Sequence, residues 1–149
     1  MMTQNVLITV CGTQTVDKES ETIETIHSGT YRSLPDMDVV LYEELLPDHT
    51  GNAIHSTKNI MKIQESQFTL VKKGAIQTEM HFAKNNTFHG FYQTPLGVFD
   101  MAIHTSALQI QTTEQCIDLM IQYALSLNGM HVSNCDMKIS IKSNEAKRK

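Results

Sequence analysis

The spacing of apolar residues after residue 36 constrains the fold of this 149-residue chain more than any other feature. From Met37 onward, most segments alternate apolar and polar residues with a period of two. A β-strand has this period, because its successive side chains point to opposite sides of a sheet. The chain is therefore predicted to be all-β and long enough for its sheet to close into a barrel.

Turn-forming residues separate the predicted strands. Glu65-Ser66, Lys73-Gly74 and Asn85-Asn86 are expected to close hairpins, since glycine and asparagine tolerate the positive φ of tight turns. Thr94-Pro95-Leu96-Gly97 has the residue preferences of a type I turn. Neighbouring strands are therefore predicted to be antiparallel. The predicted strands cover residues 5–11, 22–27, 37–46, 54–63, 68–72, 76–82, 88–92, 98–105, 108–111 and 137–142.

Residues 112–128 fit two structures. As a helix, the segment would begin with a capping box at Thr112 and Gln115 and would end at Gly129. As a strand, it would place six apolar residues at alternate positions from Ile117 to Leu127. The alternation is the better match, and the helix remains the alternative at this point.

Length, composition and charge indicate one globular domain. Residues 1–143 are assigned to the barrel, and residues 144–149 to a charged tail that we expect to be disordered. The net charge is −4, and four of the twelve lysine and arginine residues lie in the last eight positions. No nucleic-acid partner is expected, because the folded part carries no basic stripe that could follow a phosphate backbone.

The sequence also indicates a cytoplasmic protein. Its apolar runs are too short to span a membrane as a helix, and its first twelve residues lack the basic segment of a signal peptide. Cys11, Cys116 and Cys135 have no C-x-x-C spacing and are expected to be reduced thiols.

A series of short motifs follows in one order along most of the chain. They are Leu41-Tyr42-Glu43-Glu44, Lys58-x-x-x-Lys62-Ile63, Lys73-Gly74-Ala75-Ile76, Phe82, Tyr92-Gln93-Thr94-Pro95-Leu96-Gly97, Thr105, Tyr123 and Asn134. In this order they resemble the bacterial YwiB-like proteins, the DUF1934 family, from about Val6 to Ile141. The resemblance implies a calycin-like β-barrel and a strand over residues 115–127.

The chain departs from the family pattern at Lys72 and in the loop from Leu46 to Ile54, which is longer than usual. The family itself has no known reaction. The family usually has an arginine just before the Gly-Ala hairpin, where this chain has Lys72. A bidentate contact to a carboxylate or phosphate there is therefore in doubt. The expected architecture is a single antiparallel, up-and-down, lipocalin-like barrel of about eight to ten strands.

The segment Tyr42-Glu43-Glu44 places a carboxylate toward the interior or rim of such a barrel. Strand alternation puts Glu43 on one side of the sheet and Glu44, with Tyr42, on the other. A buried carboxylate needs a partner, and Lys58 or Lys62 on the next strand is expected to supply it. The alternative is a solvated edge strand or an ion pair at the rim.

Hydroxyl groups on neighbouring strands could orient a ligand among apolar walls. These side chains are Tyr92, Thr94, Thr105 and Tyr123, although tyrosine and threonine are also common strand residues and Thr94 belongs to a turn. The candidate ligand-binding residues are thus Tyr42, Glu44, Lys58, Tyr92, Thr94, Thr105 and Tyr123.

No metal ion, cofactor or catalytic residue is predicted. His81, His89 and His104 fall on predicted strands, but the sequence has no H-x-H or H-E-x-x-H spacing. Ser106 near His104 does not make a catalytic triad, which depends on geometry rather than on proximity in sequence.

Three functions are consistent with these features. The leading hypothesis is non-catalytic binding of a small, largely apolar ligand in the barrel. The alternative is a protein-interaction module or a homodimer that uses a strand edge or the outer barrel face. The third is an enzyme, such as a hydrolase or isomerase, that acts through Glu43 or Glu44 with a tyrosine.

Overall fold

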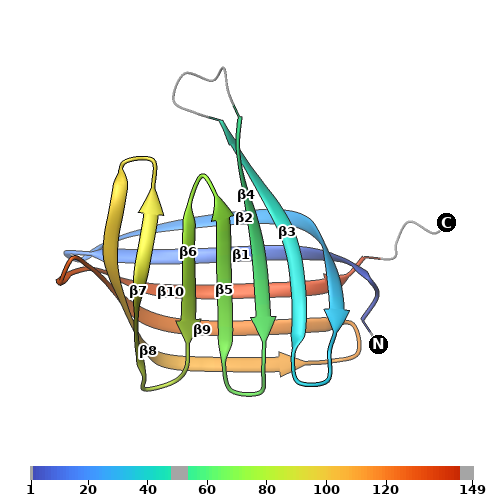
Figure 1. Cartoon of the computed structure of the whole chain (residues 1–149). Helices are drawn as coiled ribbons and strands as arrows, with labels where there is room; N and C mark the ends of the chain where they lie inside the picture. Colours follow the sequence, from blue (N-terminus) through green and yellow to red (C-terminus); the bar gives the residue numbers. More distant parts are fainter. Residues whose placement is uncertain (1, 48–53, 145–149) are drawn as a thin grey trace.

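The computed structural model describes residues 2–47 and 54–144, which form a closed antiparallel barrel (Figure 1). Each strand pairs with its neighbours in sequence, and β1 closes the barrel by pairing with β10. The strands are β1 (Asn5–Val16), β2 (Glu19–Ser33), β3 (Asp38–Pro47), β4 (Ile54–Ile63), β5 (Phe68–Gly74), β6 (Gln77–Phe82), β7 (Thr87–Thr94), β8 (Gly97–Thr112), β9 (Cys116–Leu127) and β10 (Met130–Ser143). The predicted all-β, up-and-down barrel is confirmed.

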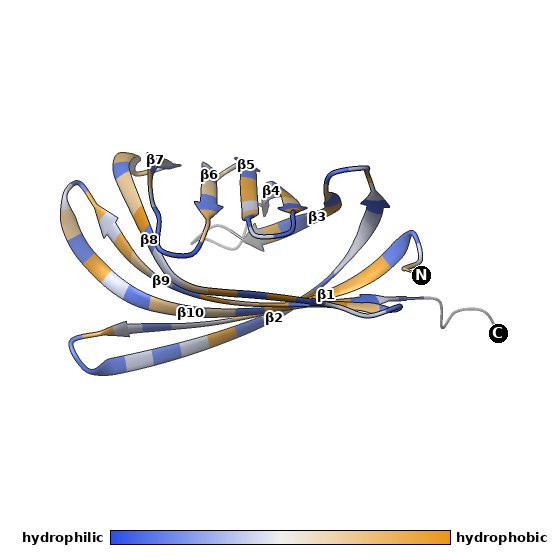
Figure 2. Ribbon diagram, turned by 90° about the horizontal axis from the view of Figure 1, so that it is seen from below, coloured by the Kyte–Doolittle hydropathy of each residue, from blue (hydrophilic) through white to orange (hydrophobic). Residues whose placement is uncertain are grey.

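The barrel is flattened into two layers. Strands β3 to β7 form one layer, and β1, β2, β8, β9 and β10 form the other, with the strands of one layer running across those of the other (Figures 1 and 2). The apolar core lies between the layers, as in two packed sheets. Its fully buried side chains include Val6, Ile8, Val40, Met61, Phe68, Phe82, Ile103, Ile117, Ile121, Ile139 and Ile141.

Strand β9 resolves the two interpretations of residues 112–128 in favour of a strand. Ile117 and Ile121 are fully buried, whereas Asp118 and Gln122 are exposed. The backbone of β9 pairs with β8 on one side and β10 on the other. The capping box therefore does not start a helix, and the segment forms the half-buried strand that its period of two indicates.

The first hairpin is longer than the sequence predicted. β1 continues to Val16, and β2 already starts at Glu19. The turn between them uses Asp17 and Lys18, with φ values of 49° and 70°, the positive φ that a two-residue hairpin turn needs. Residues Glu19–Ile26 of β2 are all exposed, so no alternation marked this part of the strand.

Strand β8 is one strand where the sequence predicted two. Its register with β9 shifts between Thr105 and Ala107, at a β-bulge. A bulge adds a residue to one strand and changes which later side chains face inward. The alternation therefore breaks near Ser106 although the strand continues to Thr112.

Two seams of the barrel are only partly paired. The register of β2 with β3 covers Gly29–Ser33 and ends where Gly29 faces Tyr42. The register of β6 with β7 consists of Gln77 with Gln93 and Thr78 with Tyr92. The first seam lies between the two layers and the second within one layer, and Tyr42 and Tyr92, at the ends of these two registers, line the cavity described below.

Residues 145–149, most of the predicted tail, lie outside the described residues, as does the segment 48–53. Within residues 2–47 and 54–144, the structure contains no helix of the length and apolarity needed to cross a membrane.

Candidate functional site

A cavity of about 350 Å³ lies between the two layers of the barrel. Its size falls at the lower end of the range of small-molecule sites. The apolar part of its lining consists of Val10, Met61, Leu70, Met80, Met101, Leu125, Leu127, Met137 and Ile139. Its polar part consists of Gln14, Thr25, Tyr42, Glu44, Lys72, Tyr92 and Tyr123. A mostly apolar enclosure with a few convergent polar groups is typical of a binding site.

Four methionines contribute to the apolar wall. Met61, Met80, Met101 and Met137 come from β4, β6, β8 and β10, so they approach the cavity from both layers. Methionine has an unbranched, flexible and polarisable side chain that adapts its shape to its contacts. The wall can therefore adjust to apolar molecules of different outline.

An ion pair forms the polar side of the cavity. The Lys72 Nζ atom lies 3.0 Å from Glu44 Oε1, and the two side chains are 20% and 24% exposed. Asn59, behind them, completes a triangle: its Nδ2 donates to Glu44 Oε1 at 3.0 Å, and its Oδ1 accepts from Lys72 Nζ at 2.8 Å. The three residues come from the adjacent strands β3, β4 and β5. Together they carry no net charge.

Alternation along β3 explains why Glu44, and not Glu43, faces the cavity. Val40 and Tyr42 are buried on the same side of the strand as Glu44. Glu43 is exposed on the opposite side, where it accepts a hydrogen bond from Ser56 Oγ. The same alternation along β5 turns Lys72 inward and leaves Lys73 exposed.

The surroundings of Glu44 lower the pKa of its carboxyl group. Burial raises this pKa, but the positive charge of Lys72 and the hydrogen bonds from Lys72 and Asn59 outweigh burial. Glu44 is therefore ionised at neutral pH and held in place by Lys72 and Asn59.

Three tyrosines complete the polar side. Burial and the negative charge of Glu44 raise the pKa of Tyr42 and of Tyr92. Burial, together with the neighbouring Cys135, raises the pKa of Tyr123. The ring of Tyr42 packs on His27 with the centroids 4.7 Å apart, and the ring of Tyr123 meets Phe82 edge-on at 4.9 Å. All three phenols therefore keep their protons at neutral pH and can donate hydrogen bonds.

The structure brings together four of the seven residues chosen from the sequence. Tyr42, Glu44, Tyr92 and Tyr123 line the cavity. Whether they bind a ligand stays a prediction. The other three residues, Lys58, Thr94 and Thr105, lie elsewhere.

The prediction that Lys58 or Lys62 would pair with the inward carboxylate is wrong. Along β4 the inward positions are Thr57, Asn59 and Met61, so both lysines point to the outer face. Lys58 lies opposite Glu43 in the register with β3. The partner of Glu44 is instead Lys72, one strand further along the sheet.

The two threonines have local roles. Thr94 stays within the β7–β8 turn, where its Oγ1 accepts from the amide of Leu96 at 3.1 Å and donates to the carbonyl of Gly97 at 3.4 Å. Thr105 is fully buried beside the bulge of β8. Within the described part of the chain, its Oγ1 has no hydrogen-bond partner.

Sequence reasoning missed Lys72, Asn59 and the methionine wall. A signal for Lys72 was present, because it follows Phe68 and Leu70 at alternate positions on β5. Asn59 likewise alternates with Met61 and Ile63. The methionines carried no such signal, since an apolar side chain that lines a cavity and one that fills a core have the same pattern.

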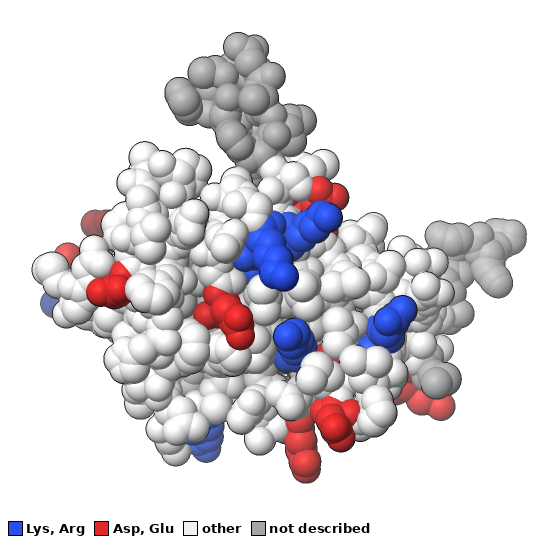
Figure 3. Space-filling view, viewed as in Figure 1, with Lys and Arg blue, Asp and Glu red and all other residues white. Residues whose placement is uncertain are grey.

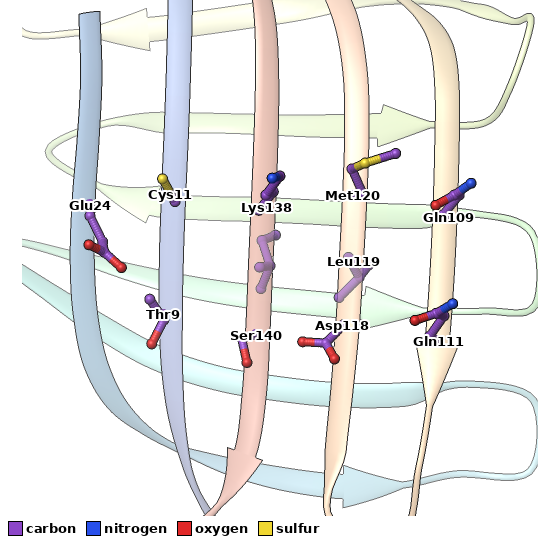
Figure 4. Close-up of a pocket in the computed structure, with 11 residues that line it drawn as sticks. Thr9, Cys11, Glu24, Gln109, Gln111, Asp118, Leu119, Met120, Lys138 and Ser140 are labelled. Carbon is purple, nitrogen blue, oxygen red and sulfur yellow. The ribbon is translucent and has the colours of Figure 1, made fainter.

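Two of the other depressions lie on the outer face of the barrel. One, of about 420 Å³, lies over β2, β1, β10, β9 and β8, where Glu24, Cys11, Lys138, Met120 and Gln109 form a row of register partners (Figure 4). The other, of about 710 Å³, lies over β5, β6 and β7. Both open on the outer surface, so neither encloses a small molecule as the interior cavity would.

Charged residues also gather outside. Lys58 and Lys73 are register partners on β4 and β5, and lysine and arginine side chains form a basic area there in Figure 3. Among residues 2–47 and 54–144, no three His, Cys, Asp or Glu side chains lie close enough to hold a metal ion. His81, one of the histidines considered from the sequence, packs on Phe88 with the ring centroids 4.4 Å apart.

Comparison with known proteins identifies a family and a related fold. The family model described as "Domain of unknown function (DUF1934)" matches residues 8–139. The crystal structure of the ywiB protein from Bacillus subtilis is similar, with a TM-score of 0.78 over 95% of this chain and 92% of that chain. At 18% sequence identity, this likeness concerns the fold. Comparison with curated proteins gives no significant match.

Proposed function

This chain belongs to the DUF1934 family of domains of unknown function, and we propose that it binds a small, largely apolar ligand inside its barrel without catalysing a reaction. The observation that supports this proposal is the cavity of about 350 Å³, which has a methionine-rich wall on one side and a few polar groups on the other. Closed barrels of this size commonly hold one small molecule.

The state of the polar residues favours binding over catalysis. Glu44 has a lowered pKa and a fixed ion pair, which makes it a weak general base and a poor general acid at neutral pH. The phenols of Tyr42 and Tyr92 have raised pKa values, so they are poor bases as well. Glu43, the other carboxylate considered for catalysis, lies outside the cavity.

The test fills the cavity and measures the binding of a neutral fluorescent dye, N-phenylnaphthylamine. Leu125→Trp places a large side chain in the cavity lining, and Gln122→Trp is the matched control on the exposed side of the same strand. We expect the first variant to weaken dye binding by at least about tenfold and the second to leave it unchanged. Equal affinity in both variants and the parent protein would rule against an interior site.

A natural ligand can be sought directly. Native mass spectrometry of protein purified from its own host, followed by denaturation and extraction, would detect a retained molecule. We expect that molecule to be lost from the Leu125→Trp variant and kept by Gln122→Trp.

The proposed setting is the cytoplasm, in keeping with Cys11, Cys116 and Cys135, which are all free thiols.

The edge of β2 that faces away from β1 favours a second candidate, the addition of a strand from another protein. Residues 19–28 of β2 pair with β1 but have no register partner on β3, and Ile23 and Ile26 in this stretch are 59% and 63% exposed. Glu21 and Glu24 lie in the same stretch. A second copy would oppose like charges across the edge, so a basic partner strand fits better.

A synthetic peptide of alternating lysine and isoleucine tests this candidate. Fluorescence anisotropy should show binding to the parent protein and loss of binding to a variant with Glu24→Lys and Ile26→Lys. Unchanged affinity in that variant would contradict the edge as the binding surface. Analytical ultracentrifugation of the protein alone would report self-association through the same edge.

A further inference from the structure

We propose that the ligand's polar end is an uncharged hydrogen-bonding group, such as a hydroxyl or a carbonyl, and that the ligand is therefore a neutral amphiphile rather than an acid or an amine. This inference rests on the proposed function, since it names the chemical class of the ligand in the same cavity. It follows from the ion pair that the two charged side chains of the cavity wall form with each other.

The charged groups of the cavity lining neutralise each other. Within the described lining, the charged side chains are Glu44 and Lys72, and they form an ion pair at 3.0 Å. Asn59 uses its amide nitrogen on Glu44 and its amide oxygen on Lys72, which holds both in place. A ligand that enters this cavity therefore meets a fixed dipole and no free charge.

A charged end group would have to break this arrangement. A carboxylate that took Lys72 as its partner would leave Glu44 without one, in a site where Glu44 is only 24% exposed. An ammonium group that took Glu44 as its partner would leave Lys72 without one. Leaving one member of a largely buried ion pair unpaired is costly, and a single new contact does not recover that cost.

The tyrosines offer the contacts that a neutral group can use. Tyr42, Tyr92 and Tyr123 line the same cavity as the ion pair. Their hydroxyls are hydrogen-bond donors that a ligand can use without breaking the ion pair. An ether, ester, ketone or alcohol oxygen would accept from them, while its apolar chain lies along the methionine wall.

The experiment compares three molecules with the same chain and different ends. Decanol, decanoate and decylammonium are titrated at neutral pH, below the concentrations at which they aggregate, against protein that carries N-phenylnaphthylamine. We expect decanol to displace the dye at concentrations at least about tenfold lower than those of either ion. Displacement by decanoate or decylammonium at equal or lower concentration would overturn the inference.

Two variants ask whether the ion pair sets this preference. Glu44→Gln keeps the side-chain shape and frees the charge of Lys72, so decanoate should become the best competitor. Lys72→Met frees Glu44, so decylammonium should gain. The matched controls, Glu43→Gln and Lys73→Met, change the neighbouring residues that face outward, and they should keep the order of the parent protein.

The outcomes separate this inference from the proposed function. If the parent protein binds the dye but prefers an ionic competitor, the inference alone is overturned. It is also overturned if a Glu44→Gln variant that circular dichroism shows to be folded ranks the three competitors as the parent protein does. Absence of dye binding to the parent protein overturns the interior site, and the inference falls with it.

Discussion

Adjacent residues of the same chemistry have opposite surroundings in this protein. Glu43 and Glu44 follow each other on β3, and Lys72 and Lys73 follow each other on β5. Alternation places Glu44 and Lys72 in the cavity wall and leaves Glu43 and Lys73 outside. The contribution of each side chain to stability and binding is therefore decided by its position in the strand and not by its type.

Loss of Lys72 should destabilise the protein. Lys72→Met removes the partner of Glu44 and leaves a mostly buried carboxylate, which we expect to cost about 1–3 kcal/mol of unfolding free energy. Lys73→Met, on the exposed side, should stay within about 0.5 kcal/mol of the parent. Urea denaturation of both variants measures this difference, and equal free energies of unfolding would show that the ion pair does not stabilise the fold.

The lowered pKa of Glu44 predicts a loss of stability in acid. Its folded-state pKa lies below the ordinary value of 4.5, so the ionised carboxylate stabilises the fold fully above that pH. The stabilisation is lost as the pH falls through the folded-state pKa. The difference in unfolding free energy between the parent and Glu44→Gln should shrink below about pH 4.5. A difference that is constant from neutral pH to pH 3 would contradict this account.

At the scale of residues, reasoning from the sequence selected Glu44 and the three tyrosines that line the cavity, but it did not select Lys72, the partner of Glu44. Alternation along Tyr42-Glu43-Glu44 required one glutamate to face inward, and this could be read directly. The choice of partner depends in addition on which faces of β4 and β5 are inside, and although Phe68 and Leu70 alternate with Lys72 on β5, Val71 makes the opposite face apolar as well. Those faces follow from the buried neighbours Met61 and Leu70, whose burial only the fold reveals.

At the scale of elements, the departure of β2 from β3 depends on a close approach at Gly29. A Cβ atom at Gly29 would lie 2.5 Å from the carbonyl oxygen of Leu41 and 2.7 Å from Ile8 Cδ1. Gly29 faces Tyr42 in the last register pair of the two strands. The absence of a side chain therefore lets β2 cross β3 closely before the two strands separate.

The substitution Gly29→Ala should therefore be costly. The added methyl group meets backbone as well as side-chain atoms, and we expect a loss of about 1–3 kcal/mol in unfolding free energy. Gly12→Ala on β1 is the matched control, because a Cβ there has no atom within 4 Å; it should be neutral or stabilise slightly. Thermal unfolding of the two variants tests this, and similar melting temperatures would refute the close approach.

The elements that the sequence predicted well are those with one buried and one wet face. β4 is an example, since its predicted bounds, residues 54–63, are those observed, and Thr57, Asn59, Met61 and Ile63 are buried at alternate positions. The start of β2 lacked this contrast because both of its faces are exposed. β8 lost it at the bulge, where an extra residue shifts the alternation.

At the scale of the whole molecule, the sequence predicted the closure of the sheet but not its cavity. Closure follows from consecutive antiparallel hairpins, which leave β1 and β10 to pair with each other. An interior volume depends on the summed sizes of side chains from both layers. Residues that contribute to it, such as Met101 and Leu127, have the same pattern in the sequence as residues of a filled core.

The central claim is that the alternation of side chains along the strands creates an interior site that small apolar molecules can reach. Two tryptophan substitutions test this claim most directly. The natural chain has no tryptophan, so Tyr92→Trp reports from the cavity, and Phe91→Trp reports from the outer face, where Phe91 is 64% exposed. We predict blue-shifted emission that responds to decanol for Tyr92→Trp, and red-shifted emission without a response for Phe91→Trp. Equal spectra, or a response from Phe91→Trp alone, would contradict the claim.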